Sequence, residues 1–185
     1  SFSRPMGPMG INDSVKALGL PSTVVNYVDF WQTEDLLEFI DTWLTQNNVT
    51  NGCFALSSLF QVELALTSGT TIYEIVQEIK TRYPTFKIVC GGPALNFAMN
   101  PNQNWEPDAV FSSNNSVGLF QDWLLNKDIP EDCIKIHPNG VPEYRAPAGF
   151  SSRDVTLVEK PHVPILHDDY CLDSQDTLTF EIRKG

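Results

Sequence analysis

Small hydroxyl residues and paired glycines follow two apolar runs of this chain, and both kinds of residue can help to hold a ligand. The residues after the runs 53–56 and 88–90 are Ser57, Ser58 and Leu59, and Gly91, Gly92 and Pro93. Hydroxyl groups can hydrogen-bond the polar edge of a cofactor, and glycines let the backbone approach a flat group because no Cβ is present. The alternative is that the paired glycines only form the turn after a strand.

The segment between the two runs predicts how these residues are brought together. From Thr71 onward, apolar residues recur at helical spacing and alternate with charged and amide side chains. A strand, a helix and a second strand in this order form a parallel βαβ unit. Ligands of such folds bind beyond the carboxyl ends of the strands. We therefore expect the hydroxyl residues and the glycines to lie at one edge of a sheet.

Further elements of the same kind surround this unit. We expect helices beginning near Asn12 and Asp13 and ending before Gly19, from Thr33 to about residue 44, and over 117–125. The Thr33 side chain is expected to open a capping box. Runs at 23–28 and 109–111 are predicted strands. The alternation predicts an α/β fold, a Rossmann-like, flavodoxin-type doubly wound parallel sheet of about five strands.

Two more loops of this predicted sheet join the candidate site. The loop 3–10 follows the end of a first strand at Ser1 and Phe2, and it contains Met6 and Gly7. The loop 112–115 follows the strand 109–111 and contains Asn114. Both belong to the carboxyl ends of predicted strands, so we include them among the residues that contact a ligand.

The amino-acid composition of the chain changes after residue 127, where prolines interrupt every candidate element. We predict two parts, a Rossmann-like domain over 1–127 and an irregular proline-rich tail over 128–185. The tail is expected to cross the domain surface as a linker, with 134–136 as a possible extra strand. The strictly alternating residues 177–183 predict a strand that begins a further domain.

Size and composition restrict the class of protein. The chain has 185 residues, is 42% hydrophobic and carries a formal net charge of −11. Such a charge, without a basic stripe, argues against nucleic acid or an anionic membrane as a partner. No apolar segment reaches the roughly 20 residues that span a bilayer, so we expect a cytoplasmic protein. The four cysteines form no CxxC pair, so the sequence predicts no structural zinc site.

The pattern over residues 1–125 resembles the cobalamin-binding domain at the N-terminus of B12-type radical S-adenosylmethionine enzymes. Ser57, Ser58 and Leu59 match the SxL element of that family, and Gly91 and Gly92 match its GG element. The resemblance implies that SxL flanks the nucleotide tail of cobalamin and that GG lines its pocket. It also implies that residues 179–185 resemble the first strand of a radical barrel domain, which would be the partner of this module. The [4Fe-4S] cluster and S-adenosylmethionine would then bind only in that barrel, after this chain.

The loop 3–10 departs from part of the family because it contains no histidine that could ligate cobalt. Two readings follow. The chain is a cobalamin-binding module that lacks a protein axial ligand and shows no turnover by itself, or it is a cofactor-free module that binds another small molecule, a substrate or a protein partner. The polar residues 112–116 favour the second reading, and the SxL and GG elements favour the first.

Other candidate chemistry has ordinary explanations. His137, His162 and His167 all fall in the predicted tail. His167 is followed by two aspartates, but adjacent residues on an extended chain point in different directions, so we predict no metal site. Ser57 and Ser58 are not expected to act as nucleophiles, because no GxSxG motif surrounds them and no histidine lies in the predicted domain.

Overall fold

The computed structural model describes residues 6–25, 31–57, 71–91, 107–112 and 116–147. The chain forms two compact units, of which the first contains the described residues 6–25 and the second those from 31 to 147. In the first unit, α1 (Met6–Lys16) is followed by a turn in which Gly19 has a left-handed φ of 75°. Each unit is described by itself.

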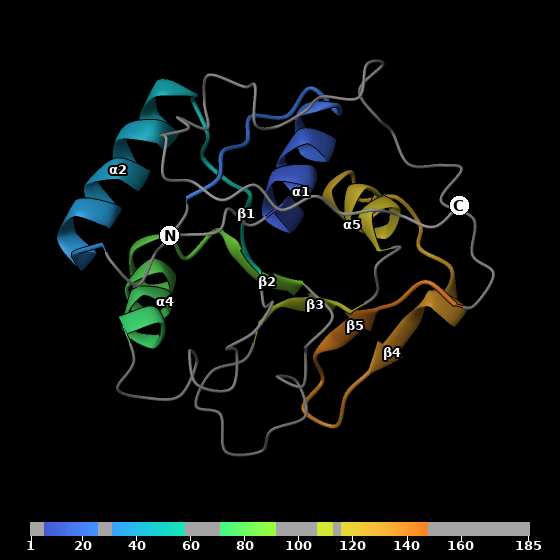
Figure 1. Cartoon of the computed structure of the whole chain (residues 1–185). Helices are drawn as coiled ribbons and strands as arrows, with labels where there is room; N and C mark the ends of the chain where they lie inside the picture. Colours follow the sequence, from blue (N-terminus) through green and yellow to red (C-terminus); the bar gives the residue numbers. More distant parts are fainter. Residues whose placement is uncertain (1–5, 26–30, 58–70, 92–106, 113–115, 148–185) are drawn as a thin grey trace. The chain divides into compact units, whose positions relative to one another are not determined.

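The described residues of the second unit form three helices, a short 3-10 helix and five strands (Figure 1). The helices are α2 (Thr33–Gln46), α4 (Thr71–Arg82), α5 (Val117–Leu124) and the 3-10 helix η3 (Glu131–Cys133). The strands are β1 (Cys53–Ser57), β2 (Lys87–Gly91), β3 (Ala109–Phe111), β4 (Ile134–Ile136) and β5 (Pro142–Tyr144).

The five strands form one sheet in the order β1-β2-β3-β5-β4. The strands β1, β2, β3 and β5 are parallel, and β4 pairs antiparallel with β5. The predicted α/β fold with a mostly parallel sheet is therefore confirmed. The central strands β2 and β3 are buried at Ile88, Val89, Cys90 and throughout 109–111, as continuous apolar runs predict for parallel strands covered on both faces.

Helices cover both faces of this sheet. On one face, the Phe54 ring lies 5.5 Å from the ring of Tyr83, which directly follows α4. On the other face, Phe111 packs against Phe120 of α5, with ring centroids 5.1 Å apart. The register places Ala55, Val89 and Ala109 side by side. Because side chains alternate along a strand, Phe111 lies on the same face of the sheet as these three residues, and Phe54 lies on the opposite face. The sheet is thus a layer between helices.

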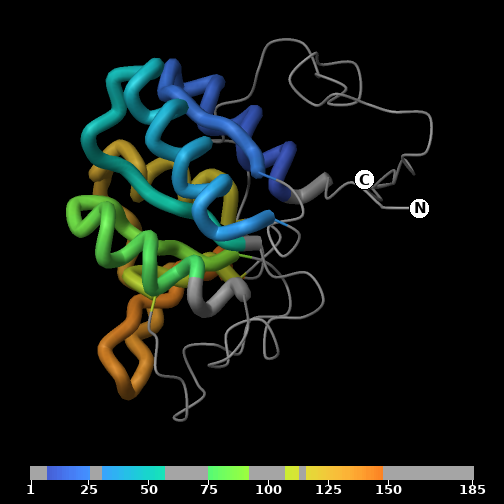
Figure 2. The backbone as a smooth tube through the Cα atoms, turned by 90° about the vertical axis from the view of Figure 1, so that its left-hand side faces the viewer, coloured from blue at the N-terminus to red at the C-terminus, as the bar shows by residue number. Residues whose placement is uncertain are grey.

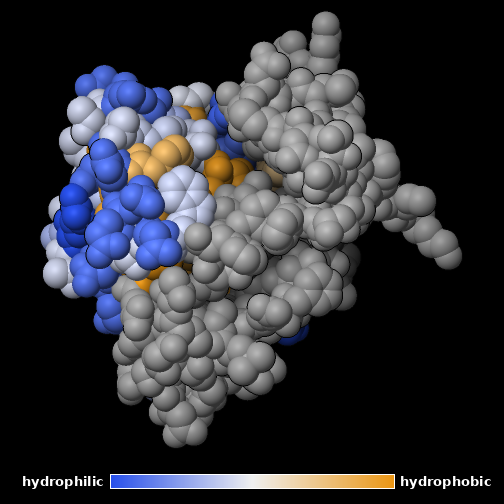
Figure 3. Space-filling model, turned by 60° about the vertical axis from the view of Figure 1, so that its left-hand side comes forward, coloured by the Kyte–Doolittle hydropathy of each residue, from blue (hydrophilic) through white to orange (hydrophobic). Residues whose placement is uncertain are grey.

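The helix α2 lies beside α4. The Asp41 carboxylate of α2 accepts hydrogen bonds from the Tyr83 hydroxyl, at 2.5 Å, and from the Arg82 guanidinium. The buried apolar residues of α2 are Leu36, Leu37 and Ile40, and those of α4 are Ile75, Val76 and Ile79. Figure 2 shows the two helices as neighbours, and Figure 3 shows hydrophilic side chains over this side of the molecule. None of the helices that the structure describes has the length and apolar content needed to cross a membrane.

Several sequence predictions need correction. The possible extra strand at 134–136 is confirmed as β4. The rest of 131–144, which we assigned to an irregular tail, contributes η3 and β5, and β4 and β5 complete the sheet. Pro142 is tolerated because the first residue of a strand is one of the few strand positions open to proline. Residues 23–25 lie in no strand, and 26–28 are outside the described residues. The N-cap of α2 is Gln32, without a side-chain cap bond, so Thr33 does not open the expected capping box.

Candidate functional site

The carboxyl ends of β1 and β2 bring two of the predicted site residues together. Ser57 and Gly91 are the last residues of their strands, and they are partners in the parallel register. Gly91 is in turn the register partner of Phe111, which pairs with Tyr144 of β5. The structure therefore arranges one row across the sheet, in which a hydroxyl residue and a glycine lie next to two aromatic residues.

Gly91 leaves space at this edge. A Cβ added to Gly91 would meet the backbone oxygen of Phe111 at 3.7 Å, which is an ordinary van der Waals distance. Packing among the described residues therefore does not require a glycine at this position. The missing side chain is consistent with a site for a ligand, although the end of a strand alone would also accept it.

The other predicted site residues lie either in α1 or outside the described residues. Met6 and Gly7 belong to the first turn of α1, so the expected loop 3–10 is helical from Met6 onward. Proline is tolerated in a first turn because that turn lacks hydrogen-bond acceptors for its N–H groups, which explains how Pro8 can occur there. Ser58, Leu59, Gly92, Pro93 and Asn114 lie outside the described residues.

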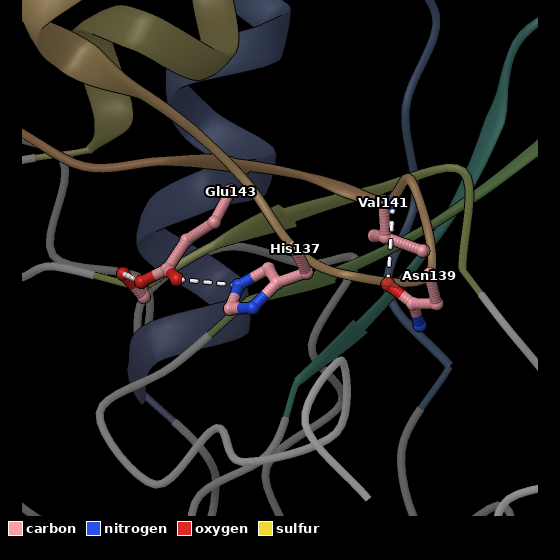
Figure 4. A network of polar contacts seen from close by, with 5 residues as sticks. His137, Asn139, Val141 and Glu143 are labelled. Carbon is pink, nitrogen blue, oxygen red and sulfur yellow. Dashed lines mark hydrogen bonds and ion pairs between the residues drawn. The ribbon is translucent and has the colours of Figure 1, made fainter. Parts of the chain in front are cut away.

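A polar network joins β3 to the hairpin of β4 and β5. The Ser112 hydroxyl, directly after β3, donates to Oε1 of Glu143 in β5. The Nε2 atom of His137 lies 2.6 Å from Oε2 of the same carboxylate, and Figure 4 shows the ring turned toward Glu143. The side chains of His137 and Glu143 are 3% and 13% exposed. Because an ionised carboxylate only accepts, Nε2 carries the hydrogen and donates it.

The hairpin holds His137 in place. The backbone N–H of His137 donates to the Val141 oxygen at 3.0 Å, and the backbone oxygen of His137 accepts from the N–H of Gly140 at 2.8 Å. Gly140 has a φ of 85°, which favours glycine, and the Asn139 side chain accepts from the Val141 N–H (Figure 4). Val110 of β3 is the register partner of Glu143, so the Glu143 side chain extends from the same face of the sheet as the buried Val110 side chain.

The network sets the protonation state of Glu143. Burial alone would raise the pKa of this carboxyl, but the hydrogen bonds from Ser112 and His137, and the charges of His137 and Lys135, lower it below its ordinary value. Glu143 is therefore a weak base at neutral pH. It lies between the serine and the histidine, whereas a nucleophilic triad needs the histidine in the middle. We infer that the network fixes geometry and does not activate Ser112.

Sequence reasoning missed Glu143 and misplaced His137, which is buried in the sheet unit and is not part of an irregular tail. The signal was present in the stretch Pro138-Asn139-Gly140, which is typical of a three-residue hairpin loop in which a turn is followed by a glycine with a left-handed φ. It lies between two short stretches of β-forming residues. The prolines at 138 and 142 concealed this pattern.

Metal ligation and thiol chemistry find little support in the described part of the chain. In those residues, no three His, Cys, Asp or Glu side chains gather in a way that could hold a metal ion. Cys53, Cys90 and Cys133 are free thiols. Burial raises the pKa of Cys53 to about 11 and also raises that of Cys90, so both remain protonated and unreactive at neutral pH.

Comparison of the chain with protein-family models, curated proteins and solved structures gave no match.

Proposed function

We propose that this chain is the cobalamin-binding module of a larger B12-type radical S-adenosylmethionine enzyme, with a Rossmann-like, flavodoxin-type topology. The observation that carries the proposal is the register pairing of Ser57 with Gly91 at the carboxyl ends of adjacent parallel strands. These residues belong to the SxL and GG elements on which the family resemblance depends. Parallel strand ends are also where α/β folds bind their ligands.

The described residues leave room for cobalamin at Gly91, and they restrict which side chains could ligate its cobalt. Gly91 offers an approach to the backbone without a side chain. His137 cannot supply an axial ligand at this edge, because Glu143 holds its Nε2 atom and its backbone pairs with Val141 before the start of β5. Cobalamin would therefore be held without an imidazole from the described residues. When bound, cobalamin would serve as the methyl carrier of the parent enzyme.

In this proposal the module works in the cytoplasm and docks on the radical barrel of its parent. The parent would catalyse a radical methylation or a related rearrangement, using its own [4Fe-4S] cluster and S-adenosylmethionine. The module alone would bind and orient the cofactor and would show no turnover.

The proposal is tested by titrating the chain with hydroxocobalamin and passing the mixture through gel filtration. We expect corrin absorbance in the protein peak. Gly91→Leu places a bulky side chain at the proposed edge and is expected to abolish the absorbance, whereas Thr42→Leu adds the same side chain to an exposed position of α2 and should leave it unchanged. Both variants should retain the circular dichroism of the wild type. Absence of corrin from the wild-type peak would reject cobalamin as the ligand.

A cofactor-free recognition module is the second candidate. It is favoured by the lack of a histidine in residues 3–10 and by the position of the His137 backbone beside the start of β5, away from the carboxyl ends of the parallel strands. In that case the same edge would bind a substrate or a protein partner. Failure of the chain to retain corrin, together with binding of the parent's barrel domain that Gly91→Leu weakens, would support this candidate.

A further inference from the structure

The strand β4 presents an open edge. It is the last strand of the sheet, and no strand in the described ranges pairs with its outer side (Figure 1). The Cys133 oxygen accepts from the Arg145 N–H and the His137 N–H donates to Val141, both toward β5. Backbone groups alternate in direction along an antiparallel strand, so those of Ile134 and Ile136 point outward.

Most of these outward groups have no hydrogen-bond partner among the described residues. The N–H of Ile134 donates to the Glu131 oxygen in η3. The oxygen of Ile134 and both backbone groups of Ile136 therefore face the open edge. Protein sheets usually protect such edges because they attract other chains. The only protective charge within β4 is Lys135, on the face opposite the two isoleucines.

An apolar surface lies beside this edge. Ile136 is 63% exposed and Leu125 is 39% exposed, and these are the exposed large hydrophobic residues in the described part of the chain. A shallow groove of about 290 Å³ lies beside β4, and its apolar lining comes from Trp123, Ile129, Ile134 and Tyr144. Ile134 and Ile136 share one side of β4. The groove thus continues the apolar side of the open strand.

The charges around the groove are mainly negative. Asp128, Glu131 and Asp132 are exposed, whereas the Lys127 ammonium lies 3.6 Å from Asp122 and is neutralised by it. A partner with basic residues beside an apolar centre would complement this surface. The opposite face of β4 carries Lys135, which favours an acidic side chain directly across from it.

We propose that the outer edge of β4 binds an extended peptide segment of a protein partner as a sixth strand. Apolar side chains at alternate positions of that segment would cover Ile136 and enter the groove, and basic residues at its ends would face Asp128 and Glu131. Main-chain hydrogen bonds supply the affinity of such strand addition, and the alternating side chains supply its specificity. The proposal does not depend on cobalamin binding.

The test uses the full chain and the synthetic peptide acetyl-Arg-Ile-Glu-Ile-Thr-Val-Arg-amide. Amide shifts in ¹⁵N correlation spectra are expected at Ile134, Ile136 and the groove residues. Ile136→Pro removes an outward N–H that β5 does not use, and edge positions tolerate proline. It should weaken peptide binding at least tenfold, while the matched variant Ile136→Val should bind within about threefold of the wild type because it keeps that N–H group.

A second probe keeps the proposal testable if Ile136→Pro disturbs the fold. The same peptide with N-methyl groups on the amides that face β4 should bind the wild-type chain at least tenfold more weakly. Three results would overturn the proposal. They are no shifts at β4 up to millimolar peptide, equal binding of the methylated peptide, or shifts at β4 that depend on protein concentration without peptide, which would identify a second copy as the occupant.

Discussion

Replacing Glu143 by alanine is expected to destabilise the fold by about 3 kcal/mol, because hydrogen bonds to a charged group are worth roughly 1.5–3 kcal/mol each and Glu143 accepts two. The Ser112 hydroxyl and the buried His137 ring would both lose their acceptor. The Glu143→Gln variant keeps the shape and part of the hydrogen bonding, and we expect it to lose about half as much.

The effect of Glu143 should depend on pH in a defined direction. The pKa of its carboxyl is lowered in the folded chain, so its contribution is fully present above the ordinary pKa of about 4.5 for glutamate. The contribution is lost as the pH falls below that value and through the folded pKa. Urea unfolding at pH 7 and at several pH values below 4.5 measures this directly. The stability difference between the wild type and Glu143→Ala should shrink in acid toward the smaller difference between Glu143→Gln and Glu143→Ala, because a protonated carboxyl keeps part of the hydrogen bonding.

The matched control is Glu131→Ala, which removes an exposed carboxylate from η3 in the same region. It should change the free energy of unfolding by less than about 0.5 kcal/mol, as exposed substitutions usually do. A comparable effect of the two substitutions at pH 7, or a Glu143→Ala effect that does not shrink in acid, would refute the role assigned to this network.

Three further predictions concern the core and the helix contacts. Cys53 is half-buried and its pKa is raised to about 11, so a thiol reagent at pH 8 should label it more slowly in the folded chain than in urea, as read by peptide mass spectrometry; equal rates would contradict the raised pKa. Tyr83→Phe removes the hydrogen bond to Asp41 and should cost about 1 kcal/mol in urea unfolding; an unchanged midpoint would contradict a stabilising bond. Ile88→Ala, at a side chain that is 2% exposed, should cost about 3 kcal/mol, and a loss below 1 kcal/mol would show that β2 is not central to the core.

The elements with strong periodicity could be predicted from sequence. The helix from Thr33 and the strands β1, β2 and β3 follow from apolar residues at helical spacing or in short continuous runs. The pairing of Ser57 with Gly91 follows from the same reasoning, since parallel strands end at one edge. Local pattern was sufficient for β2 and β3 because their apolar runs are almost fully buried, and β1 shows the same kind of short apolar run.

The hairpin of β4 and β5 could not be predicted in the same way. Its strands have three residues each, and Pro142 lies in one of them. Such short strands are stabilised by their neighbours in the sheet and not by their own propensity. The network around Glu143 depends on the long-range pairing of β5 with β3, which no local pattern reveals. For the same reason, a buried histidine looked like a residue of an exposed tail.

The position of the ligand site is tested most directly by ¹⁵N correlation spectra of the full chain during a titration with hydroxocobalamin. The account predicts saturable shifts of the Ser57 and Gly91 amides, which share one register pair at the carboxyl edge of the sheet. Those shifts should disappear in Gly91→Leu and persist in Thr42→Leu. A titration that leaves both amides unchanged, or that moves only residues far from the ends of β1 and β2, would contradict the account.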